Sequence, residues 1–80
     1  MSTDDFEIQA QKLLEMCMEI NRHEGFVVIF LFSGGSNAVN IDIKKDWDVV
    51  LCQTYFENEI ADAFNAVKGV LYEIEARLAS

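Results

Sequence analysis

The longest uninterrupted apolar run in the chain covers residues 26–32, FVVIFLF, with Gly25 before it and Ser33-Gly34-Gly35 after it. Valine, isoleucine and phenylalanine favour extended backbone, and the run is far shorter than the roughly 20 residues that a helix needs to cross a bilayer. We therefore predict a strand over residues 26–33. Its two faces carry Phe26, Val28, Phe30 and Phe32, and Val27, Ile29 and Leu31. Both faces are apolar, so both need cover.

A turn and a second strand follow. Residues 33–37 are rich in glycine and end in asparagine, and both residue types adopt the positive φ that tight hairpin turns need. A phosphate-binding loop would instead need Lys and then Ser or Thr directly after the last glycine. Residues 38–44 then alternate strictly and predict a strand. Its inward side chains are Val39, Ile41 and Ile43, and its outward ones are Asn40, Asp42 and Lys44.

A third strand is predicted over residues 47–53, WDVVLCQ, after a turn at Lys45-Asp46. Strict alternation divides it into Trp47, Val49 and Leu51 on one face and Asp48, Val50 and Cys52 on the other. Short turns between three consecutive strands favour an antiparallel meander.

Segments with helical periodicity precede and follow the three strands. The 4,3,4,3 spacing of the apolar positions predicts a first helix over about residues 5–22, with Asp4 as its N-cap and Glu7 as the capping-box partner. The apolar positions are Phe6, Ala10, Leu13, Cys17 and Ile20, widened by Leu14, Met16 and Met18. Gly25 ends the segment before the first strand.

A final helix is predicted over about residues 55–79, with Thr54 and Glu57 as its capping box and Asn58 as a later cap. Two apolar series overlap along it, namely Ile60, Phe64, Val67, Leu71, Ile74 and Leu78, and Phe56, Ile60, Ala63, Val67, Val70 and Ile74. Gly69 inside this helix costs about 1 kcal/mol relative to alanine, and such a glycine often permits close backbone approach.

These elements predict one α+β domain over residues 1–80, of order α-β-β-β-α, with both helices on one face of a three-stranded antiparallel sheet. A final helix of about 24 residues spans roughly 36 Å, whereas a seven-residue strand spans about 23 Å. The helix would overhang the sheet and remain apolar to Leu78, so we expect a homodimer or a folded partner. The expected interface residues are Phe26, Phe30, Trp47, Gly69, Leu71 and Leu78.

Charge and composition narrow the class of protein. Fourteen acidic against six basic residues give a net charge of −8, which disfavours direct binding to nucleic acid. Solubility explains the acidity better than mimicry of a nucleic acid does. The acidic N-terminus resembles no signal peptide, and no segment suits a membrane span, so we expect a soluble, cytoplasmic protein. Cys17 and Cys52 are expected to be buried, reduced thiols.

Candidate chemistry is sparse. His23 is the only histidine, and it has no companion ligands at a recognisable metal spacing. Asp42, Asp46 and Asp48 lack the glycine and the closing glutamate of a calcium loop, and they are interpreted as an edge strand and turn kept soluble by charge. No base stands beside a nucleophile, so we expect no enzyme, no metal and no cofactor.

One binding cluster is nevertheless a candidate. Asn37, Asn40, Lys44, Lys45 and Trp47 gather around the second strand, and tryptophan is enriched among interface anchors. The alternative, which we favour, is that Trp47 closes the core at the edge of the sheet.

A quarter of the chain also carries a family resemblance. Phe30-x-Phe32-Ser33-Gly34-x-x-Asn37-x-Val39-x-Ile41, followed by Trp47, resembles small phage and prophage proteins, although many of these have histidine at the position of Gly35. The resemblance implies viral origin and no agreed activity. We expect a non-enzymatic, acidic protein-interaction module that occupies a host or viral protein. The alternatives are a self-associating structural component, an acidic chaperone and a nucleic-acid-mimic inhibitor.

Overall fold

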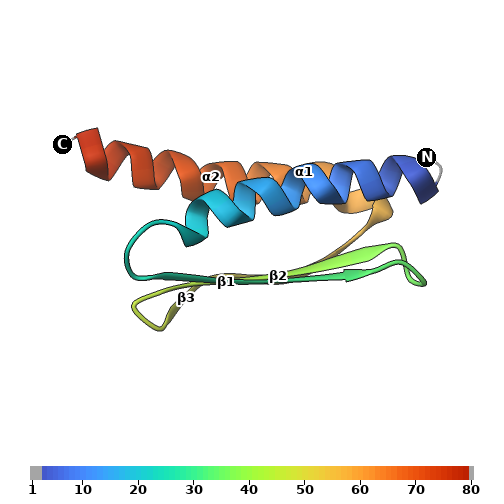
Figure 1. Cartoon of the computed structure of the whole chain (residues 1–80), viewed down its shortest axis with the longest axis horizontal. Helices are drawn as coiled ribbons and strands as arrows, with labels where there is room; N and C mark the ends of the chain where they lie inside the picture. The colour runs from blue at the N-terminus through green and yellow to red at the C-terminus, as the bar shows by residue number, and fades with distance from the viewer. Residues whose placement is uncertain (1–2, 80) are drawn as a thin grey trace.

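The computed structural model describes residues 3–79 as two layers, with both helices on one face of a three-stranded sheet (Figure 1). The order is α1 (Thr3–Asn21), β1 (Phe26–Ser33), β2 (Ala38–Lys45), β3 (Asp48–Phe56), a 3-10 turn η1 (Glu57–Glu59) and α2 (Ile60–Ala79). The predicted α+β fold of order α-β-β-β-α is confirmed. The molecule measures 42 × 22 × 17 Å along its principal axes.

The sheet is an antiparallel meander of order β1-β2-β3, so β2 is central and β1 and β3 are its edges. Val39, Ile41 and Ile43 of β2 point to the helices and are fully buried, as their alternation predicts. Because β2 is central, the interpretation of Asp42 as part of a charged edge strand is wrong. The charge of Asp42 lies instead in the middle of the outer face.

The first hairpin closes at the pair Ser33 and Ala38, which confirms the predicted turn. Positive φ is found at Asn37 (47°) but at neither Gly34 nor Gly35. The asparagine therefore supplies the left-handed residue of this turn.

The second hairpin differs from its prediction. Lys45 pairs with Asp48, and the two residues between them, Asp46 and Trp47, both have positive φ (52° and 73°). Positive φ at both central residues is the signature of a type I′ turn, whose twist suits a hairpin. Trp47 is therefore a turn residue and not the first residue of the third strand.

A β-bulge separates residues of β3 that strict alternation places on the same face. Ile43 pairs with Leu51 and Lys44 with Val49, which leaves Val50 as the extra residue. Val49 therefore lies on the outer face and Leu51 on the helix face, although strict alternation places them together. The prediction is wrong because a bulge adds one residue to the count without any local signal in the sequence.

The core lies between the layers, and the predicted stripe of α1 is confirmed. Its buried residues are Phe6, Ala10, Leu13, Cys17 and Ile20 from α1, Val39, Ile41, Ile43 and Tyr55 from the sheet, and Ile60, Ala63, Val67, Val70 and Ile74 from α2. Of the two series proposed for the final helix, the one that contains Ala63 and Val70 faces the core. Phe6 also stacks on Phe32, with ring centroids 5.8 Å apart.

The final helix starts later than predicted. Tyr55 is buried in the core, which keeps the chain in β3 as far as Phe56. The Thr54 hydroxyl accepts a hydrogen bond from Asn40 Nδ2 and caps no helix. The Phe56 N–H instead donates to Glu59 Oε1 at 3.2 Å, which is the reciprocal half of a capping box. The Asp4 side chain, proposed as the cap of the first helix, lies outside the described residues.

The late start also removes most of the predicted overhang. The 20 residues of α2 span about 30 Å, and the nine residues of β3 span a similar length. The C-terminal end of α2 still extends beyond the sheet, and Leu78 near that end is 71 % exposed (Figure 1). The overhang of α2 therefore accounts for only a small part of the exposed apolar surface of the molecule.

Substitution of Gly69 tests whether this glycine of α2 is needed for close packing. A Cβ added there would meet no atom within 4 Å, so no described neighbour approaches this glycine closely. We expect Gly69→Ala to raise the free energy of unfolding by about 0.5–1 kcal/mol, because glycine loses more conformational entropy on folding. Urea titrations measure the change, and Ala76→Gly on the exposed side of the same helix should lower stability by a similar amount. A Gly69→Ala protein less stable than the wild type would contradict this expectation.

Candidate interaction surfaces

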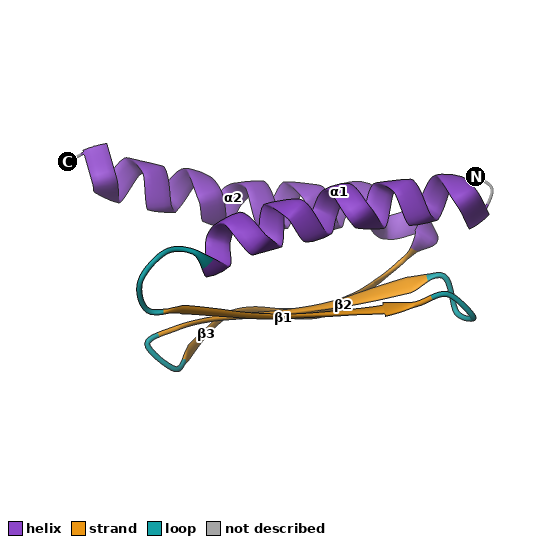
Figure 2. Ribbon diagram, in the orientation of Figure 1, coloured by secondary structure: helices purple, strands orange, loops and turns teal. Residues whose placement is uncertain are grey.

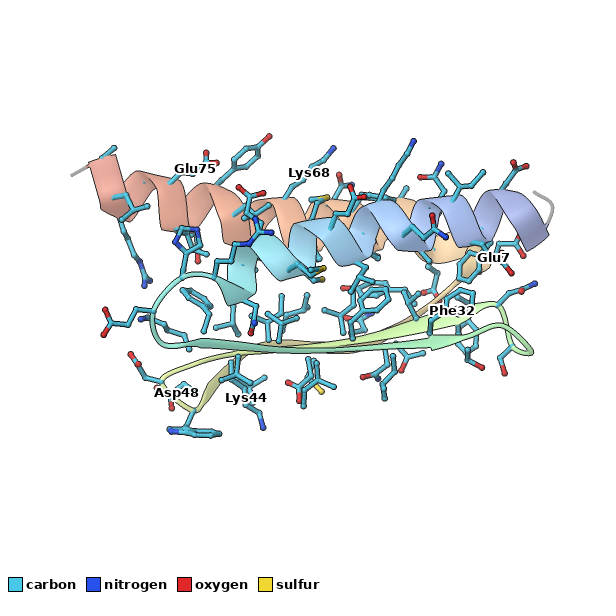
Figure 3. All side chains as sticks on the ribbon, viewed as in Figure 1. Glu7, Phe32, Lys44, Asp48, Lys68 and Glu75 are labelled. Atoms are coloured by element: carbon cyan, nitrogen blue, oxygen red, sulfur yellow. The ribbon has the colours of Figure 1, made fainter. Side chains whose placement is uncertain are left out.

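One face of the sheet carries no described helix, strand or loop (Figure 2). We call it the outer face; Lys44 projects from it, away from α1 and α2 (Figure 3). Strand pairing arranges it in cross-strand rows, namely Val27–Lys44–Val49, Ile29–Asp42–Cys52, Leu31–Asn40–Thr54 and Ser33–Ala38–Phe56. The face therefore has apolar side chains along β1, polar ones along β2 and a mixture along β3.

The polar row of β2 is internally connected. Asn40 Nδ2 donates to Thr54 Oγ1 at 2.8 Å, and Lys44 Nζ lies 3.9 Å from Asp42 Oδ2. The other carboxylate oxygen of Asp42 is buried and has no hydrogen-bond partner among the described residues. A buried acceptor without a partner is uncommon in folded proteins. The Asp42 side chain as a whole is 20 % exposed, so its carboxylate contributes to the outer face.

Trp47 stands at one end of the outer face and is 80 % exposed. The hypothesis that it closes the core is therefore wrong. The left-handed backbone that the turn imposes costs an L-residue with a side chain about 1–2 kcal/mol, and asparagine or glycine usually fills such positions. Together with Gly25, Phe26, Val27 and Asp46, Trp47 lines a shallow pocket of about 290 Å³.

The other members of the predicted binding cluster are divided. Asn40 and Lys44 lie on the outer face, with Lys44 in the row nearest Trp47 and Asn40 two rows further along. Asn37 lies at the opposite end of β2, where its Nδ2 donates to Glu57 Oε2 at 3.2 Å. Lys45 points toward the helices: its Nζ donates to the Glu24 carbonyl at 2.9 Å and lies 5.2 Å from the centre of the Phe26 ring.

The six proposed interface residues likewise do not form one surface. Phe30 is half-buried at the β1 edge, Phe26 lies beneath Lys45, and Trp47 is in the second turn. The α2 members are separate from these: Gly69 and Leu78 are exposed, and Leu71 packs partly against the core.

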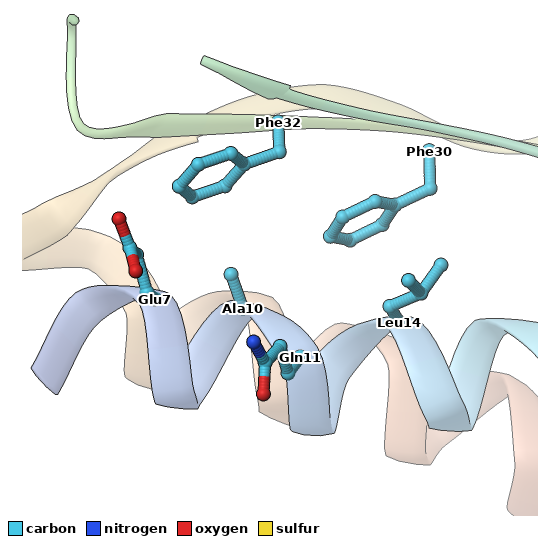
Figure 4. A pocket seen from close by; sticks show the side chains of 6 residues that line it. All are labelled: Glu7, Ala10, Gln11, Leu14, Phe30 and Phe32. Atoms are coloured by element: carbon cyan, nitrogen blue, oxygen red, sulfur yellow. The ribbon is translucent and has the colours of Figure 1, made fainter. Parts of the chain in front are cut away.

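A groove along the β1 edge was missed by the sequence reasoning. Glu7, Ala10, Gln11 and Leu14 of α1 and Phe30 and Phe32 of β1 line about 290 Å³ of open space, which we call the β1 edge groove (Figure 4). Only Glu7 among these six residues is charged. A second hollow of about 190 Å³ continues it along the same edge, past Met18 and Val28. No single segment signals the groove, because α1 and β1 contribute to it jointly.

Two titratable side chains of the described residues have shifted pKa values. No group of three or more His, Cys, Asp or Glu side chains that could hold a metal ion occurs within residues 3–79. The expectation of two buried thiols is half wrong, because Cys17 is buried and Cys52 is exposed on the outer face. Burial raises the pKa of the Cys17 thiol to about 11. Burial also raises the pKa of Tyr55, with smaller contributions from Asp62 and Glu59. Neither helix of the described chain is long and apolar enough to cross a membrane.

Comparison of the chain with protein-family profiles, curated proteins and solved structures gave no match. Function must therefore be inferred from the surface of the molecule. That surface offers an outer face with an exposed tryptophan and an apolar groove at one edge.

Proposed function

We propose that this chain is a non-enzymatic protein-interaction module that acts by occupying a partner protein through Trp47 and the outer face. The observation that carries the proposal is the placement of Trp47, which is 80 % exposed in a backbone conformation unfavourable to it. Local strain of this kind persists mainly at functional sites. Tryptophan is also among the residues that most often dominate binding energy.

The surroundings of Trp47 support a protein partner. Val27 and Val49 lie in the nearest cross-strand row, with the Lys44 ammonium between them. The Asp42 side chain, which is 20 % exposed, lies further along the same face and adds a carboxylate to it. An apolar anchor with a few polar groups around it is the usual composition of an interface centre.

Charge suggests the kind of partner. The net charge of −8 attracts basic surfaces and speeds their encounter with this chain. A basic host or viral protein is therefore the proposed partner, in keeping with the phage resemblance, and the cytoplasm is the proposed location. The proposal also includes a homodimer, because the β1 edge groove leaves apolar surface that the outer face does not account for.

Substitution of Trp47 tests the proposal without damaging the fold. We expect Trp47→Gly to stabilise the protein by about 1 kcal/mol, because glycine adopts positive φ without strain, and to weaken partner binding by at least about 30-fold. The partner is captured at low and at high salt, and its affinity for the wild type and the variant is then measured by calorimetry.

Tyr72→Ala is the matched control. Tyr72 is an exposed aromatic residue on α2, in the other layer of the molecule, so its loss should leave affinity unchanged. Failure to capture any partner at either salt concentration would refute the proposal. Equal affinities of the wild type and Trp47→Gly would refute the role of the tryptophan.

A further inference from the structure

We infer that the β1 edge is the interface between two copies of this chain, which pair antiparallel through β1 into one continuous sheet of six strands. The inference rests on the proposed function only in that this function includes a homodimer, and it gives that dimer a geometry. The surface involved is distinct from Trp47, so the two proposals can fail separately.

The two edges of the sheet differ in their protection. Proteins commonly guard an exposed edge with charge, proline, a bulge or a covering segment. The β3 edge begins with Asp48 and carries the bulge at Val50. The eight residues of β1 form a regular ladder with β2 and contain no charge, no proline and no bulge. An edge of this kind is suited to pairing with another strand.

Hydrogen bonds show which part of the β1 edge is free. The Val28 N–H donates to Asn21 Oδ1 at 3.2 Å, and the Phe26 N–H donates to the His23 carbonyl at 3.2 Å, so both amides point away from β2. Alternation along an antiparallel strand places the N–H and C=O of Phe30 and Phe32 on this same edge. The first half of the edge is therefore capped from within the chain, and the second half is available.

This division selects a register. If Phe30 pairs with Phe32 of the partner subunit, and Phe32 with Phe30 of the partner subunit, four backbone hydrogen bonds form and the Asn21 cap is kept. The two-fold axis then passes beside Leu31, which meets Leu31 of the partner subunit on the outer face. Leu31 is the most exposed large apolar residue of β1, at 60 %. The Phe30 and Phe32 rings lie on the other face, at the mouth of the β1 edge groove (Figure 4).

Charge favours a second copy over a basic protein as the occupant. Residues 26–37 contain no charged side chain, although 25 % of the whole chain is charged. Two molecules of net charge −8 repel each other, and they can approach most closely through a surface without acids. A basic partner would find almost no carboxylate here. The apolar residues gathered on this side are Leu14, Met18, Val27, Ile29, Leu31 and Phe32, each between 38 % and 60 % exposed.

Sedimentation equilibrium on the full chain tests the inference. We expect the wild type to have twice the 9.1 kDa mass of one chain and Leu31→Lys to sediment as a monomer, with the dissociation constant raised at least about 100-fold. Because Leu31 is exposed in the single chain, the variant should keep the wild-type circular dichroism spectrum. Val49→Lys is the control: Val49 lies on the same face but on β3, and its substitution should leave the dimer intact.

Cysteine cross-linking tests the register independently. In a Cys52→Ser background, Leu31→Cys should form an intermolecular disulfide on mild oxidation, because facing residues at such an axis have Cα atoms about 4.5 Å apart. Val27→Cys, on the same face but far from the axis, should form none. Cross-linking at Val27→Cys but not at Leu31→Cys would overturn the register.

A monomeric wild type at about 100 μM, or a dimer that Leu31→Lys leaves unchanged, would overturn the inference itself. The same variants separate it from the function proposed above. Capture of the partner by monomeric Leu31→Lys supports both proposals. A partner that binds a wild-type monomer through Trp47 would overturn the dimer alone, and a dimer that binds no partner would overturn the proposed function alone.

Discussion

Replacement of Leu13 by alanine is expected to lower the free energy of unfolding by about 3–5 kcal/mol, whereas the same replacement at Leu14 should lower it by about 1 kcal/mol. The two leucines are neighbours on α1, but Leu13 is 0 % exposed within the core and Leu14 is 38 % exposed in the β1 edge groove. Truncation of a buried leucine loses its transfer free energy and leaves a cavity, while a site open to solvent collapses or refills.

The expected loss at Leu13 is large compared with the total free energy of unfolding of so small a protein. A domain of 80 residues has a total stability of about 4–12 kcal/mol, so Leu13→Ala should remove a large part of it. Urea titrations at one fixed protein concentration give both values, since dimerisation would make the midpoints depend on concentration. Equal losses at the two positions would show that the helix layer is rotated relative to the sheet.

Raising the pH from 9 to 11 is expected to destabilise the protein through Cys17 by about 2 kcal/mol. Burial raises the pKa of this thiol from 9.0 to about 11, so the folded protein keeps the proton that the unfolded chain loses. The stabilisation is thus fully present below pH 9 and is lost as the pH rises toward 11. The raised pKa of Tyr55 acts in the same direction.

Unfolding midpoints measured between pH 7 and pH 11 check this expectation. In Cys17→Val the thiol is replaced by an apolar side chain of similar size, so the decline should be shallower by the Cys17 contribution. Cys52→Ser, at the exposed thiol, should follow the wild type. Parallel curves for the wild type and Cys17→Val would mean that Cys17 is solvated in the folded state.

Hydrophobic periodicity predicts the parts of this fold whose pattern is regular. The stripe of α1 and the alternation of β2 each assign a face correctly, because burial on one side imposes the period of the element. The failures fall between residues 47 and 57. There, a type I′ turn contains a tryptophan, a bulge shifts the alternation at Val50, and Tyr55 keeps the chain in β3 past the apparent cap at Thr54. In each case a tertiary contact or a turn geometry overrides the local pattern.

The candidate surfaces likewise depend on turn geometry and tertiary contacts. Tryptophan is hydrophobic and on average highly buried, so the sequence favours a place for Trp47 in the core. Its position in the turn is seen only in the structure, where its φ is positive. The β1 edge groove requires two facts absent from any local pattern: β1 ends the sheet, and α1 lies above that edge. The apolar character of residues 26–32 is visible in the sequence, but the reason for it is not.

The row formed by Asn40, Asp42 and Lys44 would let the two proposed interaction surfaces discriminate between partners. Two copies stacked face to face would bury both ions of each molecule, at a cost of several kcal/mol per ion after relaxation. A foreign protein with donors and acceptors in matching positions offsets that desolvation cost. This cost would disfavour self-stacking through the outer face, while the uncharged edge beside it would remain open to the second copy that we propose.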